Sequence, residues 1–237
     1  MKLLLIILPG WGGSKKTWQG FSDKASNFFD VLVLDLPCFG DEPCPTTVWG
    51  VDEYAKFVEK KLEKFSDREV VLFGHSFGGQ IAAHLAAQNK NICEKLILSG
   101  AAVYRKKRTL KNIIFKLIAV TGNFIFSMPM LWKVKTKART VLYKAADSPD
   151  YLQTSGIQRD IFKKVIREDV SGELKNISIK TLVVWGDKDS YTPLEQGKKI
   201  AEQIPGSILK VIEGGTHGLH LNTSDELLNA IHEFVSS

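Results

Sequence analysis

The stretch Val70–Gln88, VVLFGHSFGGQIAAHLAAQ, runs from an apolar segment through Gly-His-Ser-Phe-Gly into a helix-forming sequence. Its first residues, Val70–Phe73, are all apolar, which is typical of a strand buried on both faces of a sheet. Glycines at 74 and 78 leave room for a sharp, strained turn at Ser76. Such a turn lifts the serine above the carboxyl end of its strand, where open α/β sheets bind ligands. The stretch therefore predicts a buried strand, a helix and an accessible hydroxyl between them.

Five further apolar segments are interpreted as strands of the same kind: Leu3–Leu8, Val31–Leu36, Lys95–Ser99, Thr181–Trp185 and Ile208–Ile212. The segments between them have helical spacing, as in Val51, Tyr54, Ala55, Val58 and Leu62. Strands that alternate with helices predict an α/β fold, a mostly parallel sheet of about six strands flanked by helices. A chain of 237 residues suffices for one large domain.

The alternation stops over residues 101–176, which we interpret as a helical cap inserted into a core formed by 1–100 and 177–237. Residues 105–139 hold ten basic residues and no acidic one. Such a stretch suits an acidic partner, an acidic substrate or an anionic surface, but it is equally typical of a solvated helix face. No nucleic-acid-binding module is recognisable, and no apolar run is long enough for membrane insertion.

The cysteines favour a reduced environment. Cys38, Cys44 and Cys93 have no metal-type spacing and form no even-numbered framework. The apolar run Leu3–Leu8 is short for a signal peptide and is followed at once by Pro-Gly-Trp. We therefore expect a cytoplasmic protein with a buried strand near its start.

A serine becomes a nucleophile when a base takes its proton and a third group orients that base. The segment TLVVWGDKDSYTP offers Asp187 and Asp189 after one late strand. The segment VIEGGTHGLHLN offers His217 and His220 after the last strand. Nucleophile, acid and histidine thus follow one another along the chain, which predicts nucleophilic catalysis by Ser76.

With these motifs the chain resembles serine hydrolases of the α/β-hydrolase fold, over nearly all of its length apart from the insertion. The family's Gly-x-x-Asp pattern matches Gly-Asp-Lys-Asp here and implies that Asp189 is the acid. The family's glycine-rich loop that ends in the catalytic histidine implies that His217 is the base. Asp187 and His220 remain the alternatives for these two roles.

The resemblance also implies an oxyanion hole formed by the backbone amides of Trp11 and Phe77. Related enzymes often have His-Gly-Trp-Gly in the first of these loops, whereas this chain has Pro9 in place of the histidine. In the nearby sequence DLPCFG, Asp35 is interpreted as a structural hydrogen-bonding residue, and Cys38 replaces a glycine of the family pattern.

The activity implied is cleavage of carboxylic esters through an acyl-enzyme, with no metal and no cofactor. The alternatives are a lactonase, including one for acyl-homoserine lactones, an ester hydrolase acting on an acidic carrier protein, and a slow-turnover ligand-binding regulator. An apolar cluster in the insertion is predicted to bind the substrate: Phe124, Phe126, Met128 and Trp132.

Overall fold

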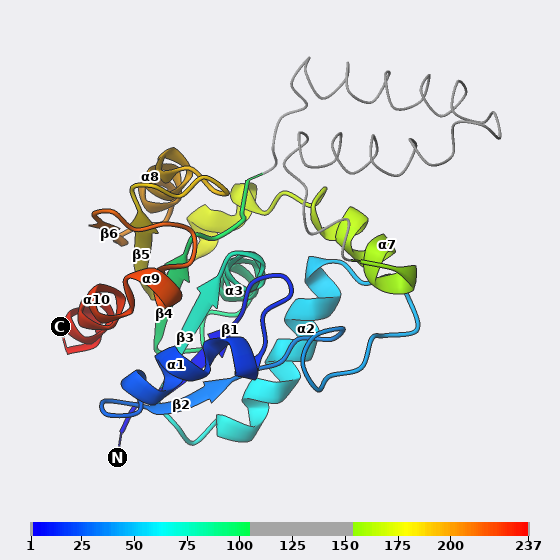
Figure 1. Ribbon diagram of the computed structural model, residues 1–237, viewed down its shortest axis with the longest axis horizontal. Coiled ribbons are helices and arrows are strands. Elements are labelled where there is room, and N and C mark those ends of the chain that lie inside the picture. The colour runs from blue at the N-terminus through cyan, green and yellow to red at the C-terminus, as the bar shows by residue number, and fades with distance from the viewer. Residues whose placement is uncertain (1, 105–153, 237) are drawn as a thin grey trace, which may run out of the picture.

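The sheet has six parallel strands in the order β2-β1-β3-β4-β5-β6. The computed structural model describes residues 2–104 and 154–236, and Figure 1 shows the sheet between two sets of helices. The strands are β1 Leu4–Leu8, β2 Asp30–Val33, β3 Val70–His75, β4 Lys95–Ser99, β5 Lys180–Gly186 and β6 Ile208–Ile212. The predicted α/β architecture with a six-stranded, parallel sheet is confirmed.

Strand β1 shows why an uninterrupted apolar run forms a central strand. Leu4, Ile6 and Leu8 are buried in the hydrophobic cluster on one face of the sheet. Leu5 and Ile7, which alternate with them, are buried in the cluster on the other face. Successive side chains of a strand point to opposite faces, so a strand covered on both sides needs apolar residues at every position.

The helices cover both faces of this sheet (Figure 1). One face is covered by α2 Val51–Leu62, α3 Phe77–Gln88, α7 Gly156–Val165, the 3-10 helix η3 Ser171–Asn176 and α8 Leu194–Gln203. The other is covered by α1 Lys15–Ala25, α9 Leu219–Asn222 and α10 Ser224–Ser236. A short 3-10 helix, η1 Glu63–Phe65, extends α2.

The predicted strand Val31–Leu36 is longer than the strand observed. Strand β2 ends at Val33, and only one further bond, from the Leu34 amide to the Ile7 carbonyl at 3.0 Å, continues the pairing. The chain then turns at Asp35, whose carboxylate accepts from the Lys15 amide at 2.7 Å and the Asp41 amide at 3.1 Å. Asp35 thus ends the strand and organises the loop, in line with its predicted structural role.

The expectation that every strand is covered on both faces is wrong for β6. This strand lies at the edge of the sheet, and Ile208 and Val211 are 47% and 40% exposed. An edge strand pairs on one side alone, so its side chains are less completely covered.

Residues 105–153 of the predicted cap lie outside the described residues. The described remainder is 101–104 and 154–176, and the latter forms α7 and η3, whose residues Ile161, Val165 and Leu174 belong to the same buried cluster as α2 and α3. This end of the segment packs on the core, and the extent of a separate cap remains a prediction.

The expectation that the cysteines form no disulfide framework is wrong for two of them. Cys38 and Cys44 form a disulfide with a Cα–Cα distance of 4.1 Å, whereas Cys93 is free and buried. The loop between the two paired cysteines turns back on itself, and the Cys38 amide donates to the Pro43 carbonyl at 3.4 Å. Cysteine spacing does not reveal such a turn.

Candidate active site

Ser76 is the single residue between β3 and α3. Its φ of 52° and ψ of −113° place it in a region that residues with a Cβ rarely adopt. A Cβ at Gly78 would overlap the carbonyl oxygen of Leu8, and a Cβ at Gly74 would lie 2.7 Å from the carbonyl oxygen of Gly78. The sharp strand-to-helix turn expected from the sequence is therefore present, and it requires both glycines.

Backbone hydrogen bonds hold Ser76 in this conformation. Its amide donates to the Ser99 carbonyl at 3.0 Å, and its carbonyl accepts from the amides of Gln80 and Ala102, each at 3.0 Å. These partners come from α3, from the end of β4 and from the loop that follows β4. The side-chain hydroxyl is not needed for any of these bonds, so it remains available for chemistry.

Asp189 and His217 form the second part of the site. Nδ1 of His217 lies 2.7 Å from Oδ2 of Asp189, and the Asp189 side chain is only 1% exposed. Asp187, the alternative acid, is exposed. The geometry therefore pairs His217 with Asp189.

The loop after β5 holds the Asp189 carboxylate firmly. Oδ1 accepts from the amides of Tyr191 and Thr192 at 2.8 and 2.9 Å, and Oδ2 lies 2.9 Å from the Thr192 hydroxyl. Burial alone would raise the pKa of Asp189. The hydrogen bond to His217, the charge of His217 and the hydrogen bonds from Thr192 outweigh burial, so the pKa of Asp189 is lowered overall. Asp189 is thus kept as a carboxylate, the form that can orient an imidazole.

Gly100 connects the two parts of the site. It lies in the loop after β4 whose backbone bonds Ser76, and its φ is 53°. A Cβ on Gly100 would lie 3.1 Å from Nδ1 and Cε1 of His217. The His217 ring therefore packs on the loop that also holds Ser76. Because Nδ1 faces Asp189, Nε2 is the nitrogen left to accept a proton.

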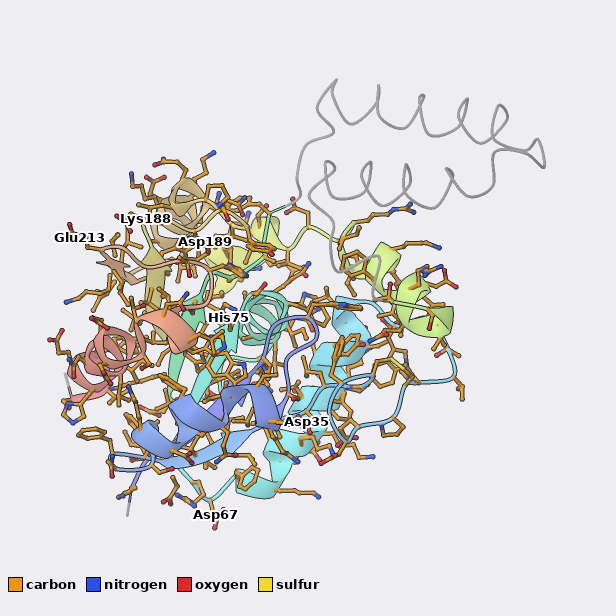
Figure 2. The ribbon with its side chains drawn as sticks, in the orientation of Figure 1. Asp35, Asp67, His75, Lys188, Asp189 and Glu213 are labelled. Carbon is orange, nitrogen blue, oxygen red and sulfur yellow. A yellow bond between two sulfur atoms is a disulfide. The ribbon has the colours of Figure 1, made fainter. Side chains whose placement is uncertain are left out.

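The residue before Ser76 also lies beside His217. The rings of His75 and His217 have centroids 4.8 Å apart. Figure 2 shows His75 and Asp189 in the same part of the molecule, far from Asp67 in the turn before β3. Ser76, Asp189 and His217 follow the carboxyl ends of β3, β5 and β6, which lie at the same end of the parallel sheet although they are distant in sequence.

The loop after β1 lies directly against Ser76. A Cβ on Gly10 would lie 3.1 Å from the Cβ of Ser76, and the Gly13 amide closes a turn on the Gly10 carbonyl at 2.9 Å. Within residues 2–104 and 154–236, the amides of Trp11 and Phe77 have no protein acceptor. Trp11 follows Gly10, which packs against Ser76, and Phe77 follows Ser76 itself. Both predicted donors therefore lie in the backbone next to the nucleophile.

Sequence comparison places this geometry in a family. The pattern that defines the α/β hydrolase fold matches residues 4–223. The chain belongs to the α/β hydrolase fold family. It is similar to the uncharacterised hydrolase YugF of Bacillus subtilis, with 30% identity over 86% of this chain and 80% of that protein.

Two further similarities come from esterases. The pimeloyl-[acyl-carrier protein] methyl ester esterase of Vibrio campbellii is 22% identical over 98% of this α/β hydrolase and 94% of its own length. The solved structure of an esterase from Exiguobacterium antarcticum superposes with a TM-score of 0.76 at 21% identity, covering 99% of this chain and 92% of that one. The structural likeness establishes the fold.

Two other histidines of this α/β hydrolase lie next to His217 without taking its place. His220, the alternative base, stacks on Trp18 with ring centroids 3.7 Å apart and is not bonded to Asp189. Burial, and then the charge of His217, lowers the pKa of His220 to about 4. Burial also lowers the pKa of His75, whose Nδ1 lies 3.1 Å from the Ser99 carbonyl. Both rings are therefore neutral at pH 7.

Sequence reasoning missed three residues of the hydrolase site: Thr192, Gly100 and Trp18. Thr192 had a usable signal, because it lies three residues after Asp189 in a polar turn sequence in which a carboxylate readily accepts from the backbone ahead of it. Gly100 and Trp18 had none, because their partners are brought together only by the folded sheet.

The predicted pocket residues Phe124, Phe126, Met128 and Trp132 lie outside the described residues. In the part of this hydrolase that is described, no helix has the length and apolar character to pass through a membrane. The same residues contain no group of three His, Cys, Asp or Glu side chains suited to a metal ion.

Proposed function

We propose that this α/β hydrolase cleaves carboxylic esters through a covalent acyl-enzyme on Ser76. The observation that carries the proposal is the strained turn at Ser76 beside a buried Asp189–His217 pair. A structural serine has no need of such a turn, and a buried carboxylate costs free energy unless it is paired. Together they are what nucleophilic catalysis by a serine requires.

In this mechanism the oxygen of the Ser76 hydroxyl attacks the ester carbonyl carbon, and His217 Nε2 takes the proton. Asp189 keeps the His217 ring in orientation and stabilises its protonated form. The amides of Trp11 and Phe77 donate to the carbonyl oxygen as it becomes negatively charged. His217 then gives its proton to the leaving alcohol, and a water molecule hydrolyses the acyl-enzyme by the same steps.

The decisive test is the variant Ser76→Ala with p-nitrophenyl acetate and butyrate as substrates. We expect it to remove turnover while circular dichroism and the melting temperature remain close to those of the wild type. Ser66→Ala, in the turn after η1, serves as a matched control with full activity. Wild-type turnover by Ser76→Ala would refute the assignment.

A more specific candidate is hydrolysis of an ester carried on an acidic carrier protein. It is favoured by the similarity to the Vibrio campbellii carrier-protein esterase and by the basic stretch 105–139. Reversing the charge at Arg105, Lys106 and Arg108 should then raise KM for an acyl-carrier-protein methyl ester and leave p-nitrophenyl acetate unaffected. An equal effect on both substrates would remove this candidate.

A substrate panel separates the remaining alternatives. A lactone is a cyclic ester that the same groups can open, so acyl-homoserine lactones belong in the panel beside short and long acyl esters. A ligand-binding regulator would show stoichiometric labelling of Ser76 by a fluorophosphonate with negligible steady-state turnover.

A further inference from the structure

The oxyanion loop of this protein has Pro9 where related enzymes often have a histidine, so another contact must hold it. The structure provides one in the Trp11 side chain. Its ring centroid lies 4.8 Å from that of Phe39, 5.5 Å from that of Phe77 and 4.9 Å from that of Phe162. All three pairs are edge-to-face, the arrangement that aromatic rings prefer.

The three phenylalanines come from three separate parts of the chain. Phe39 lies in the disulfide loop after β2, Phe77 begins α3, and Phe162 belongs to α7. All three are buried, with exposures of 6%, 4% and 8%, whereas Trp11 is half-buried. The Trp11 indole is thus enclosed on its inner side by rings that are themselves fixed in the core.

Helix α7 is in turn anchored independently of Trp11. The Gln158 side chain donates to the Cys38 carbonyl at 3.3 Å. Lys164 lies 3.3 Å from the Glu53 carboxylate, and the carboxylate of Glu168, just after the helix, accepts from the Val51 amide at 2.6 Å. Phe162 is therefore presented to Trp11 by a helix that α2 and the disulfide loop hold in place.

We propose that Phe162 is a positioning residue for the oxyanion hole. By packing on the Trp11 indole it fixes the orientation of the Trp11 amide, which donates to the developing negative charge. The inference rests on the proposed ester hydrolysis and adds to it a residue that the catalytic motifs do not contain. It also explains how the loop keeps its geometry with proline at position 9.

The expected effect follows from what an oxyanion donor contributes. Complete loss of one such donor lowers kcat by roughly 100- to 1000-fold. A donor that is loosened but still present should cost less, so we expect Phe162→Ala to lower kcat about 10-fold or more. KM should change less than 3-fold, because the donor acts mainly after the carbonyl oxygen becomes charged.

The experiment compares Phe162→Ala and Phe162→Leu with Ile161→Ala as the matched control. Ile161 is the preceding residue of α7 and is fully buried, but it has no ring against Trp11. Phe162→Leu keeps most of the bulk and should recover part of the lost kcat. It also keeps the inference testable if Phe162→Ala does not fold.

Two measurements are needed for each variant, kcat and KM for p-nitrophenyl butyrate and the inhibition constant of phenylboronic acid. The boronic acid accepts the Ser76 oxygen on boron and becomes a tetrahedral anion that needs the oxyanion donors. We expect Phe162→Ala to weaken this inhibitor about as much as it lowers kcat. The inference is overturned if Ile161→Ala has the same effect, or if the loss is confined to KM with unchanged inhibition.

Failure of the proposed function gives a different result. In that case the wild type either shows no ester turnover or shows turnover that Ser76→Ala does not remove. Either result is obtained before any α7 variant is compared. A wild type that depends on Ser76, combined with a fully active Phe162→Ala, contradicts the role of Phe162 alone.

Discussion

Thr192 and His217 share one oxygen of the Asp189 carboxylate. Oδ2 lies 2.9 Å from the Thr192 hydroxyl and 2.7 Å from Nδ1 of His217. The threonine therefore acts on the orientation of the imidazole through the carboxylate. We therefore predict that it is a positioning residue, one that no catalytic motif includes.

Replacing Thr192 with valine removes this hydroxyl and keeps the side-chain shape. A hydrogen bond to a charged group contributes about 1.5–3 kcal/mol to stability, and because only part of this acts on the orientation of His217, we expect kcat to fall by roughly 10-fold. The pKa of Asp189 should rise toward its ordinary value, because one of the hydrogen bonds that stabilise its charged form is lost. Thr181→Val is the control, because its buried hydroxyl bonds the Ile179 carbonyl away from the site. Equal kcat for both variants would show that the shared oxygen has no catalytic consequence.

The two aspartates after β5 should differ sharply in their effect on activity. Asp189→Asn replaces the acceptor of the His217 Nδ1 proton with a group that favours the wrong tautomer, so we expect kcat to fall by about 10³- to 10⁴-fold. Asp187→Asn alters an exposed residue and should leave kcat unchanged. Steady-state kinetics with p-nitrophenyl butyrate distinguishes them, and a large loss from Asp187→Asn would reverse the assignment of the acid.

Gly100 and Gly206 allow backbone strain to be separated from crowding at the site. Both have positive φ, 53° and 70°, but only Gly100 has neighbours, whereas nothing lies within 4 Å of a Cβ at Gly206. Each change to alanine should lower the free energy of unfolding by about 1–2 kcal/mol. Gly100→Ala should in addition push against His217 and lower kcat, while Gly206→Ala should not. Urea unfolding and kcat, measured on both variants, check the two effects.

The protein should become less stable as the pH is lowered, because His220 is held neutral in the folded state. The pKa of His220 is lowered by burial to about 4 from its ordinary value of 6.5, so between these values the unfolded chain binds more protons than the folded one. Above pH 6.5 the titration of His220 has no effect on stability. Between pH 6.5 and pH 4 it lowers the free energy of unfolding by up to about 1.4 kcal/mol per pH unit.

The variant His220→Phe tests this prediction, because phenylalanine can stack on Trp18 without titrating. Urea unfolding at pH 7.5, 6 and 5 should give a shallower decrease for His220→Phe than for the wild type. His232→Gln, at an exposed position of α10, is the control and should keep the wild-type slope. Parallel slopes for His220→Phe and the wild type would contradict a neutral, half-buried His220.

The disulfide predicts a simple pattern of thiol reactivity. Without reductant, iodoacetamide should label none of the cysteines in the folded protein, because Cys38 and Cys44 are paired and Cys93 is buried. After unfolding, one label should appear, on Cys93, and three after unfolding with reductant. Mass spectrometry of tryptic peptides gives the count, and two or more labels without reductant would contradict the pairing.

The central strands could be predicted from sequence because burial on both faces leaves an uninterrupted apolar run, as in β1 and β3. The same signal misled at Leu34 and Leu36, which are buried in a loop and not in a strand. It also overstated the burial of Ile208, since composition does not reveal which strand lies at the edge.

The candidate site, like the fold, could be predicted from the sequence only in part. The positions of Ser76, Asp189 and His217 were accessible because each follows a strand at a glycine-marked turn. The contact of Phe162 with Trp11 was not marked by any motif, because it joins parts of the chain that only the fold brings together. The contact of Thr192 with Asp189 is local, and the turn sequence after Asp189 carried a signal for it that the catalytic motifs do not include.

The two described stretches of the chain each carry one half of the proposed machinery. Residues 2–104 hold Ser76 and the oxyanion loop, while residues 154–236 hold the acid and the histidine. Backbone pairing of β4 with β5 and the bond from His84 to Glu173 at 2.7 Å are non-covalent contacts between the halves. If the proposed ester hydrolysis is correct, a chain cut between residues 104 and 154 would be a split enzyme, and its activity would report whether the two fragments have reassembled.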